Sequence, residues 1–117
     1  MNIEALREYC ISKAGVLESF PFGDDTLVFK IGNKIFLLAS LANSSSFNVK
    51  CDPEKAILWR ENYPEIIPGY HMNKKHWNTV YYNGSLSDTL LYEMIDHSYE
   101  LVYNSLPKIM QNQIKDI

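Results

Sequence analysis

The sequence lacks long hydrophobic runs and is poor in cysteine. Its longest purely apolar run, "IFLLA" at residues 35–39, is far too short to cross a bilayer. The N-terminal "MNIEALREYC" contains three charged side chains and no apolar core, which argues against a secretory signal peptide. Cys10 and Cys51 lie far apart and form no CxxC motif, so we expect isolated reduced thiols. These absences predict a cytoplasmic protein with no membrane partner.

Repeats, low-complexity tracts and linkers are also missing from the chain. The only small polar cluster, "NSSS" at residues 43–46, is typical of a loop. With 117 residues, of which 46% are hydrophobic and 21% charged, the composition is that of an ordinary soluble protein. We therefore expect one domain that spans residues 1–117.

The charge is unevenly distributed along the chain, whose formal net charge is −3. Residues 30–82 contain seven Lys or Arg against four Asp or Glu, whereas the rest contains four against ten. A basic middle segment between acidic ends hints at an anionic partner for the middle.

Three segments combine a helix-capping residue with helical spacing of apolar side chains. We expect helices at residues 3–14, 53–63 and about 88–106, capped by Asn2, Asp52 and Ser87. Gly15, Pro64 and Pro107 provide the corresponding stop signals. The remaining tail is expected to add a short turn or to fray.

The segments between the predicted helices alternate as strands do. Gly32-Asn33 predicts a two-residue hairpin in which Phe29 opposes Phe36 and Leu27 opposes Leu38. Further strands are expected at residues 47–51 and 76–82, the second after a turn at Pro68-Gly69. Consecutive strands joined by short turns pair antiparallel, so the sequence predicts an α+β two-layer sandwich with helices on one face of the sheet.

The octapeptide "YHMNKKHW" at residues 70–77 contains two histidines, two lysines and two large aromatics, but no carboxylate. Lysines supply phosphate contacts, and aromatic rings stack on bases or pack against sugars. Lys50 and Asn48 are expected on the polar side of the strand at residues 47–51, and Asn78 adds a donor. The candidate nucleic-acid-binding residues are Lys50, Tyr70, His71, Asn73, Lys74, Lys75, His76 and Trp77.

The same octapeptide allows a metal site or a catalytic thiol. If Asn73-Lys74 formed a two-residue turn, His71 and His76 would oppose each other, but zinc sites need at least three protein ligands and no third is local. Cys51 precedes a helix N-terminus, which can lower a thiol pKa, and a histidine could act as its base. Strand alternation points Cys51 inward, which favours a buried structural cysteine.

Two further interpretations remain open. The segment "PGYHM" at residues 68–72, together with Trp77, could line a pocket for a small ligand or contact a protein partner. The turn formers Pro68, Gly69 and Asn73 also suit a purely structural role.

Three stretches occur together and in order: "FPFG" at 20–23, "NVKCDPE" at 48–54 and "GYHMNKKHWNTV" at 69–80. They precede a helix containing "SYELV" at 98–102, and over essentially the whole chain this resembles the MmcQ/YjbR family of small bacterial proteins. Val49 stands where Leu is commoner in the family.

The resemblance implies a CyaY-like α/β sandwich and a "double wing" DNA-binding module. A CyaY-like fold is also similar to frataxin, an iron binder with an acidic ridge, of which Glu4 and Glu8 would be a thin version. We expect a DNA-binding protein that uses its basic-aromatic strand-loop surface, as a monomer or weak dimer. We expect neither catalysis nor a cofactor. The alternative is a protein- or small-ligand-binding module.

Overall fold

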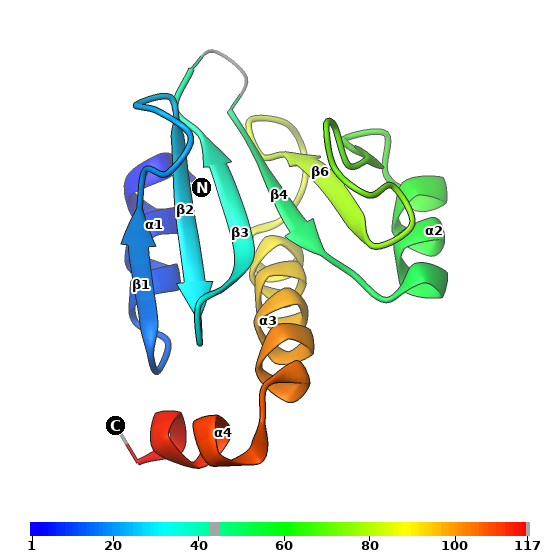
Figure 1. The fold of residues 1–117 in the computed structure, drawn as a ribbon. Helices are drawn as coiled ribbons and strands as arrows, with labels where there is room; N and C mark the ends of the chain where they lie inside the picture. The colour runs from blue at the N-terminus through cyan, green and yellow to red at the C-terminus, as the bar shows by residue number, and fades with distance from the viewer. Residues whose placement is uncertain (43–44, 117) are drawn as a thin grey trace.

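The computed structural model describes residues 1–42 and 45–116, so Asn43 and Ser44 of the predicted loop lie outside the described residues. Runs of consecutive strands separate the helices, which is an α+β order (Figure 1). In chain order the elements are α1 (Ile3–Ile11), β1 (Val16–Ser19), β2 (Thr26–Ile31), β3 (Lys34–Ser40), β4 (Ser46–Lys50), α2 (Pro53–Asn62), β5 (Ile66–Pro68), β6 (Trp77–Tyr81), α3 (Asp88–Ser105) and α4 (Lys108–Lys115).

The strands form one open sheet in the order β1-β2-β3-β4-β6-β5, with every neighbouring pair antiparallel. Each helix contributes side chains to one apolar core, among them Leu6 of α1, Trp59 of α2, Met94 of α3 and Ile114 of α4. The strands supply the other half of this core from alternate positions, such as Phe47 of β4. The predicted α+β sandwich with an antiparallel sheet is therefore confirmed.

The β2–β3 hairpin turns at Gly32-Asn33 as predicted, with φ of 56° and 66°, but the predicted pairing is wrong. Phe29 pairs with Leu37, and Leu27 pairs with Ala39. A β-bulge between Phe29 and Lys30 inserts one extra residue into the ladder and shifts every pair beyond it. As a consequence Leu37 and Ala39 lie in the core, whereas Leu38 belongs to the opposite face of the sheet.

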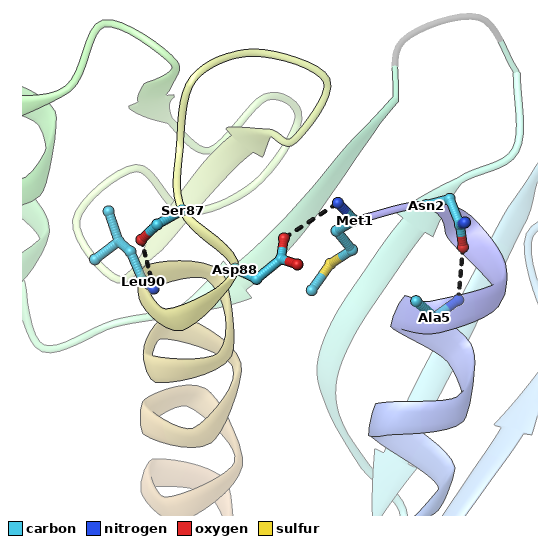
Figure 2. A network of polar contacts seen from close by, with 6 residues as sticks. All are labelled: Met1, Asn2, Ala5, Ser87, Asp88 and Leu90. Carbon is cyan, nitrogen blue, oxygen red and sulfur yellow. Dashed lines mark hydrogen bonds and ion pairs between the residues drawn. The ribbon is translucent and has the colours of Figure 1, made fainter.

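The predicted caps are all present. The side chains of Asn2 and Ser87 accept hydrogen bonds from the backbone N–H of Ala5 and Leu90, at 2.8 and 3.2 Å (Figure 2). Figure 2 also shows the N-terminal ammonium beside Asp88, 3.1 Å from its carboxylate. This contact places the start of α1 next to the start of α3.

Helix α1 is shorter than predicted because it ends at Ile11, with Ser12 as its C-cap. Gly15, predicted to end the helix, instead has φ of 76° in the turn that leads into β1, a strand that the sequence patterns did not predict. A Cβ at Gly15 would lie 3.2 Å from Ile114. The positive φ and this close approach explain why glycine occupies the turn.

Pro107 ends α3 as predicted, and the tail forms the two-turn helix α4. Within the described residues, no helix combines the length and apolar character needed to span a bilayer.

Helix α3 is tied to the centre of the sheet by a buried serine. Ser98, which has no exposed surface, donates from Oγ to the carbonyl of Phe36 in β3, at 2.5 Å. The same oxygen accepts from the backbone N–H of Lys50 in β4, at 2.8 Å. One hydroxyl therefore satisfies two backbone groups of neighbouring strands.

Replacing Ser98 with Ala leaves these two backbone groups without a partner, so we expect the free energy of unfolding to fall by about 1–3 kcal/mol. Urea denaturation measures this change. The matched control is Ser105→Ala, on the exposed end of the same helix, which should change stability by less than about 0.5 kcal/mol. Equal effects of the two substitutions would contradict the bridging role of Ser98.

Candidate functional site

The sheet face opposite the helices contains a hollow of about 630 Å³. Asn48, Thr79 and Tyr81 reach it because their strand neighbours, such as Val49 and Val80, point into the core. We call this cavity the open-face hollow. Its lining residues are Phe22, Thr26, Leu38, Ser40, Ser46, Phe47, Asn48, Tyr70, His71, Met72, Thr79 and Tyr81.

One wall of the open-face hollow comes from the β5–β6 connection at residues 69–76. Strand pairing ends at Pro68 and Asn78, and the N–H of Gly69 donates to the carbonyl of Trp77, at 2.8 Å. The connection is therefore a long loop, and the two-residue turn at Asn73-Lys74 is not formed. The proposed opposition of His71 and His76 across such a turn is accordingly wrong.

The backbone conformation of this loop depends on Gly69 and His71. A Cβ at Gly69 would lie 2.8 Å from Cβ of Trp77, so no other residue fits without displacing the chain. His71 adopts φ of 60°, a left-handed conformation that non-glycine residues rarely take. Such conformations persist only where the surroundings impose them.

Arg60 of α2 holds the loop from the helix side of the sheet. Its Nε donates to Oδ1 of Asn78 at 2.6 Å, and one terminal nitrogen donates to the carbonyl of Trp77 at 3.1 Å. The same nitrogen also donates to the carbonyl of Lys74. One guanidinium therefore joins α2, β6 and the loop through three acceptors.

Asn78 is a structural residue and not the exposed donor that the sequence suggested. Its side chain is fully buried. Its Oδ1 accepts the bond from Arg60, and its amide nitrogen has no hydrogen-bond partner among the described residues. A buried unpaired donor costs about 1–3 kcal/mol.

A short hydrogen-bond chain crosses the floor of the open-face hollow. The backbone N–H of Tyr70 donates to Oγ1 of Thr79 at 2.9 Å, and Thr79 donates in turn to Oδ1 of Asn48. The Tyr70 ring remains 65% exposed, with its centroid 4.0 Å from that of His71. The loop thus presents two adjacent rings at the edge of a polar floor.

The three candidate lysines lie near the same end of the sheet but differ in availability. Lys50 pairs with Trp77 across β4 and β6, and strand alternation puts both on the open face. Lys74 donates from Nζ to the carbonyl of Gly69, at 3.1 Å, so its ammonium helps to hold the loop. Among the described residues, the ammonium groups of Lys50 and Lys75 have no hydrogen-bond or ion-pair partner.

Two further candidates of the octapeptide, Asn73 and His76, make hydrogen bonds that stabilise the loop. The side chain of Asn73 accepts from the N–H of Lys75 at 3.0 Å, and the N–H of His76 donates to the carbonyl of Asn73 at 3.2 Å. The carbonyl of His76 accepts from the N–H of Cys51, at 2.7 Å. These bonds connect the loop to the end of β4.

The alternative chemistries find little support in this geometry. Cys51 is buried as predicted, and burial followed by the neighbouring Asp52 raises the pKa of its thiol to about 12, so the thiol stays protonated at neutral pH. Within residues 1–42 and 45–116, no group of three His, Cys, Asp or Glu side chains comes together as a metal site would require.

Sequence reasoning missed two parts of the site. Strand alternation did place Asn48 on a polar side, but nothing in the sequence linked it to Thr79 or to Phe22 across the sheet. Arg60 gave no signal at all, because its partners lie 14 to 18 residues away and meet it only through packing.

His97 of α3 is half-buried beside the start of α2. Its Nε2 accepts from the backbone N–H of Asp52 at 3.1 Å, and its ring contacts Trp59 edge-on. Burial, and then the positive charge of Lys55, lower the pKa of His97. The neutral imidazole is therefore the form that the fold requires.

Replacing Arg60 with Lys should loosen the loop, because an ammonium cannot reproduce the planar fork. We expect a loss of about 1–3 kcal/mol in the free energy of unfolding and faster amide hydrogen exchange at residues 69–77. The matched control is Arg7→Lys, which alters an exposed pair with Glu18 and should leave the free energy of unfolding nearly unchanged, because solvent screens such pairs. Unchanged exchange in the loop would contradict the anchoring role of Arg60.

The lowered pKa of His97 predicts a pH dependence of stability. As the pH falls, the unfolded chain binds the proton first, near pH 6.5, so the contribution of His97 is complete above that pH. It is lost as the pH falls from there through the lower folded pKa. Urea denaturation at several pH values measures the free energy of unfolding. As the pH falls below about 6.5, this free energy should decrease less for His97→Gln than for the wild type. The exposed His71→Gln should show the same decrease as the wild type.

Comparisons with known proteins agree with this architecture. The family model YjbR matches residues 11–101. The uncharacterized protein YbdF of Escherichia coli O157:H7 is 46% identical over 97 residues, which cover 82% of this chain and 80% of that protein. The uncharacterized protein YjbR of Escherichia coli K12 is 34% identical over 109 residues, or 92% of each chain.

Two crystal structures are also similar. DR2400 of Deinococcus radiodurans, a DUF419 domain, has a TM-score of 0.91 at 36% identity and covers 97% of this chain and 88% of its own. A Pseudomonas syringae protein has a TM-score of 0.76 at 28% identity, covering 87% of this chain and 99% of its own. Sequence, family model and fold agree, and the chain belongs to the YjbR family.

Proposed function

We propose that this chain binds single-stranded nucleic acid on the open face of its sheet and performs no catalysis. The observation that carries the proposal is the shared location of two kinds of group. Exposed aromatic rings border the open-face hollow, and Lys50 and Trp77 lie on the same face at its β4–β6 end. Rings stack on bases and lysines contact phosphates, and single-strand binders combine the two.

The phosphate contacts fall to the lysines whose ammonium groups are free. Lys50 and Lys75 meet this condition, whereas Lys74 is partly engaged with Gly69. The strand would therefore run past the β4–β6 end of the sheet, where Trp77 offers a further surface for a base or sugar.

Unpaired strands suit this surface better than a duplex does. In a duplex the bases are stacked inside the double helix, so they cannot enter the open-face hollow. The net charge of −3 and the small number of free lysines also limit counterion release, which dominates the affinity for duplexes.

A small-ligand-binding module is the second candidate, because the volume of the open-face hollow, about 630 Å³, suits a small molecule. The two functions differ in their response to salt. Uncharged ligands bind without counterion release, whereas a strand loses affinity steeply as the salt concentration rises.

The test is fluorescence anisotropy of a labelled oligothymidylate, and of a duplex of equal length, across a salt series. We expect the single strand to bind more tightly. Lys50→Ala combined with Lys75→Ala removes two phosphate contacts, so the slope of log K against log salt should flatten by about 1.4.

The matched control is Lys108→Ala combined with Lys115→Ala. It makes the same change of charge on exposed residues of α4, away from the β5–β6 loop (Figure 1). This variant should keep the wild-type slope. The proposal fails if the wild type shows no salt-sensitive binding at micromolar concentration, or if the two double variants lose the same affinity.

A further inference from the structure

The open-face hollow differs chemically from the surface around it. Among the residues that line it there is no Asp, Glu, Lys or Arg. Its walls are aromatic or apolar, and its floor offers hydroxyl and amide groups. A charged group would find no counter-charge inside, so the hollow suits a neutral ligand group.

The hydrogen-bond chain on the floor fixes the orientation of the Asn48 amide. The backbone N–H of Tyr70 can only donate, so Thr79 accepts it and has a single proton left to give. That proton goes to Asn48, and the receiving atom must therefore be the amide oxygen. The NH₂ group of Asn48 remains, and it has no partner among the described residues.

Two walls of the open-face hollow carry exposed rings from distant parts of the chain. Phe22, in the β1–β2 connection, is 65% exposed, as is Tyr70 in the β5–β6 loop. The unusual backbone conformation of His71 keeps a third ring beside Tyr70. Exposed rings around a polar floor favour a planar ligand group that packs by its faces and hydrogen-bonds by its edge.

We infer that the open-face hollow holds one unpaired nucleobase of the bound strand. The base packs against the rings of Phe22 and Tyr70, and the NH₂ group of Asn48 donates to an acceptor on its edge, such as a carbonyl oxygen. For the presence of the strand this inference rests on the proposed function, in which the lysines hold the phosphates. The hollow itself recognises the neutral base, so a free nucleoside should also enter it.

The first experiment tests the open-face hollow alone, by titrating thymidine into ¹⁵N-labelled protein and recording NMR spectra. We expect shifts concentrated at the side-chain amide of Asn48 and the backbone amide of Thr79. The substitution Asn48→Asp keeps the shape of the side chain and the oxygen that accepts from Thr79. It replaces the free NH₂ donor with a second acceptor oxygen. This variant should bind thymidine about tenfold more weakly, whereas Asn112→Asp, on α4, should bind as the wild type does.

The second experiment compares a thymidine decamer with an abasic decamer that has the same number of phosphates. We expect the abasic strand to bind about tenfold more weakly with the same salt slope, because only the base contacts are lost. Tyr70→Ala should weaken binding of the thymidine decamer and leave binding of the abasic strand unchanged.

The outcomes separate the two proposals. If both decamers bind equally with a normal salt slope and thymidine shifts no resonance of the hollow, the base site is overturned and the strand-binding function stands. If thymidine binds at Asn48 but no strand shows salt-sensitive binding, the hollow is a nucleoside site and the proposed function is overturned. If neither binds, both are overturned.

Discussion

In the part of the chain that the structure describes, helices cover only one face of the sheet, and the rest of the molecule depends on this constraint. All four helices contribute to the core on one side, and Ser98 ties α3 to β3 and β4 at the centre of that side. Because side chains alternate along a strand, each core residue has neighbours that point to the open face. In β4 and β6 those neighbours include Asn48 and Thr79, so the same strands that build the core also build the floor of the open-face hollow.

A side chain from the helix-covered side of the sheet also stabilises the loop that borders the open face. Arg60 projects from α2 and binds three acceptors in β6 and the β5–β6 loop, and Gly69 lets that loop approach Trp77 closely. The loop then carries Tyr70 and His71 to the edge of the hollow. Loops are usually mobile, but here the partly buried guanidinium of Arg60 supports the β5–β6 loop through three hydrogen bonds. Such support is what a binding site requires to keep its geometry.

Local signals predicted most of the fold. The caps at Asn2, Asp52 and Ser87 were recognisable because a capping residue acts within its own first turn. The β-bulge in the β2–β3 hairpin and the strand β1 were not, since they arise from pairing between strands and leave no local pattern. The wrong register mattered. It paired Leu38 with the core residue Leu27 and so implied the core face for Leu38, whereas Leu38 lies on the open face.

The sequence by itself determined the fold class, the family and the chemical character of the octapeptide at residues 70–77, all of which follow from short-range patterns. Only the tertiary structure decided which side chains of this region hold the fold together and which remain exposed on the open face. It assigned Lys74 and Asn78 to the scaffold and left Lys50, Lys75 and Tyr70 available. The tertiary structure also brought Phe22, Asn48 and Thr79 together around one hollow. These residues are far apart in the sequence, and they become neighbours only because the strands pair in a particular order across the sheet.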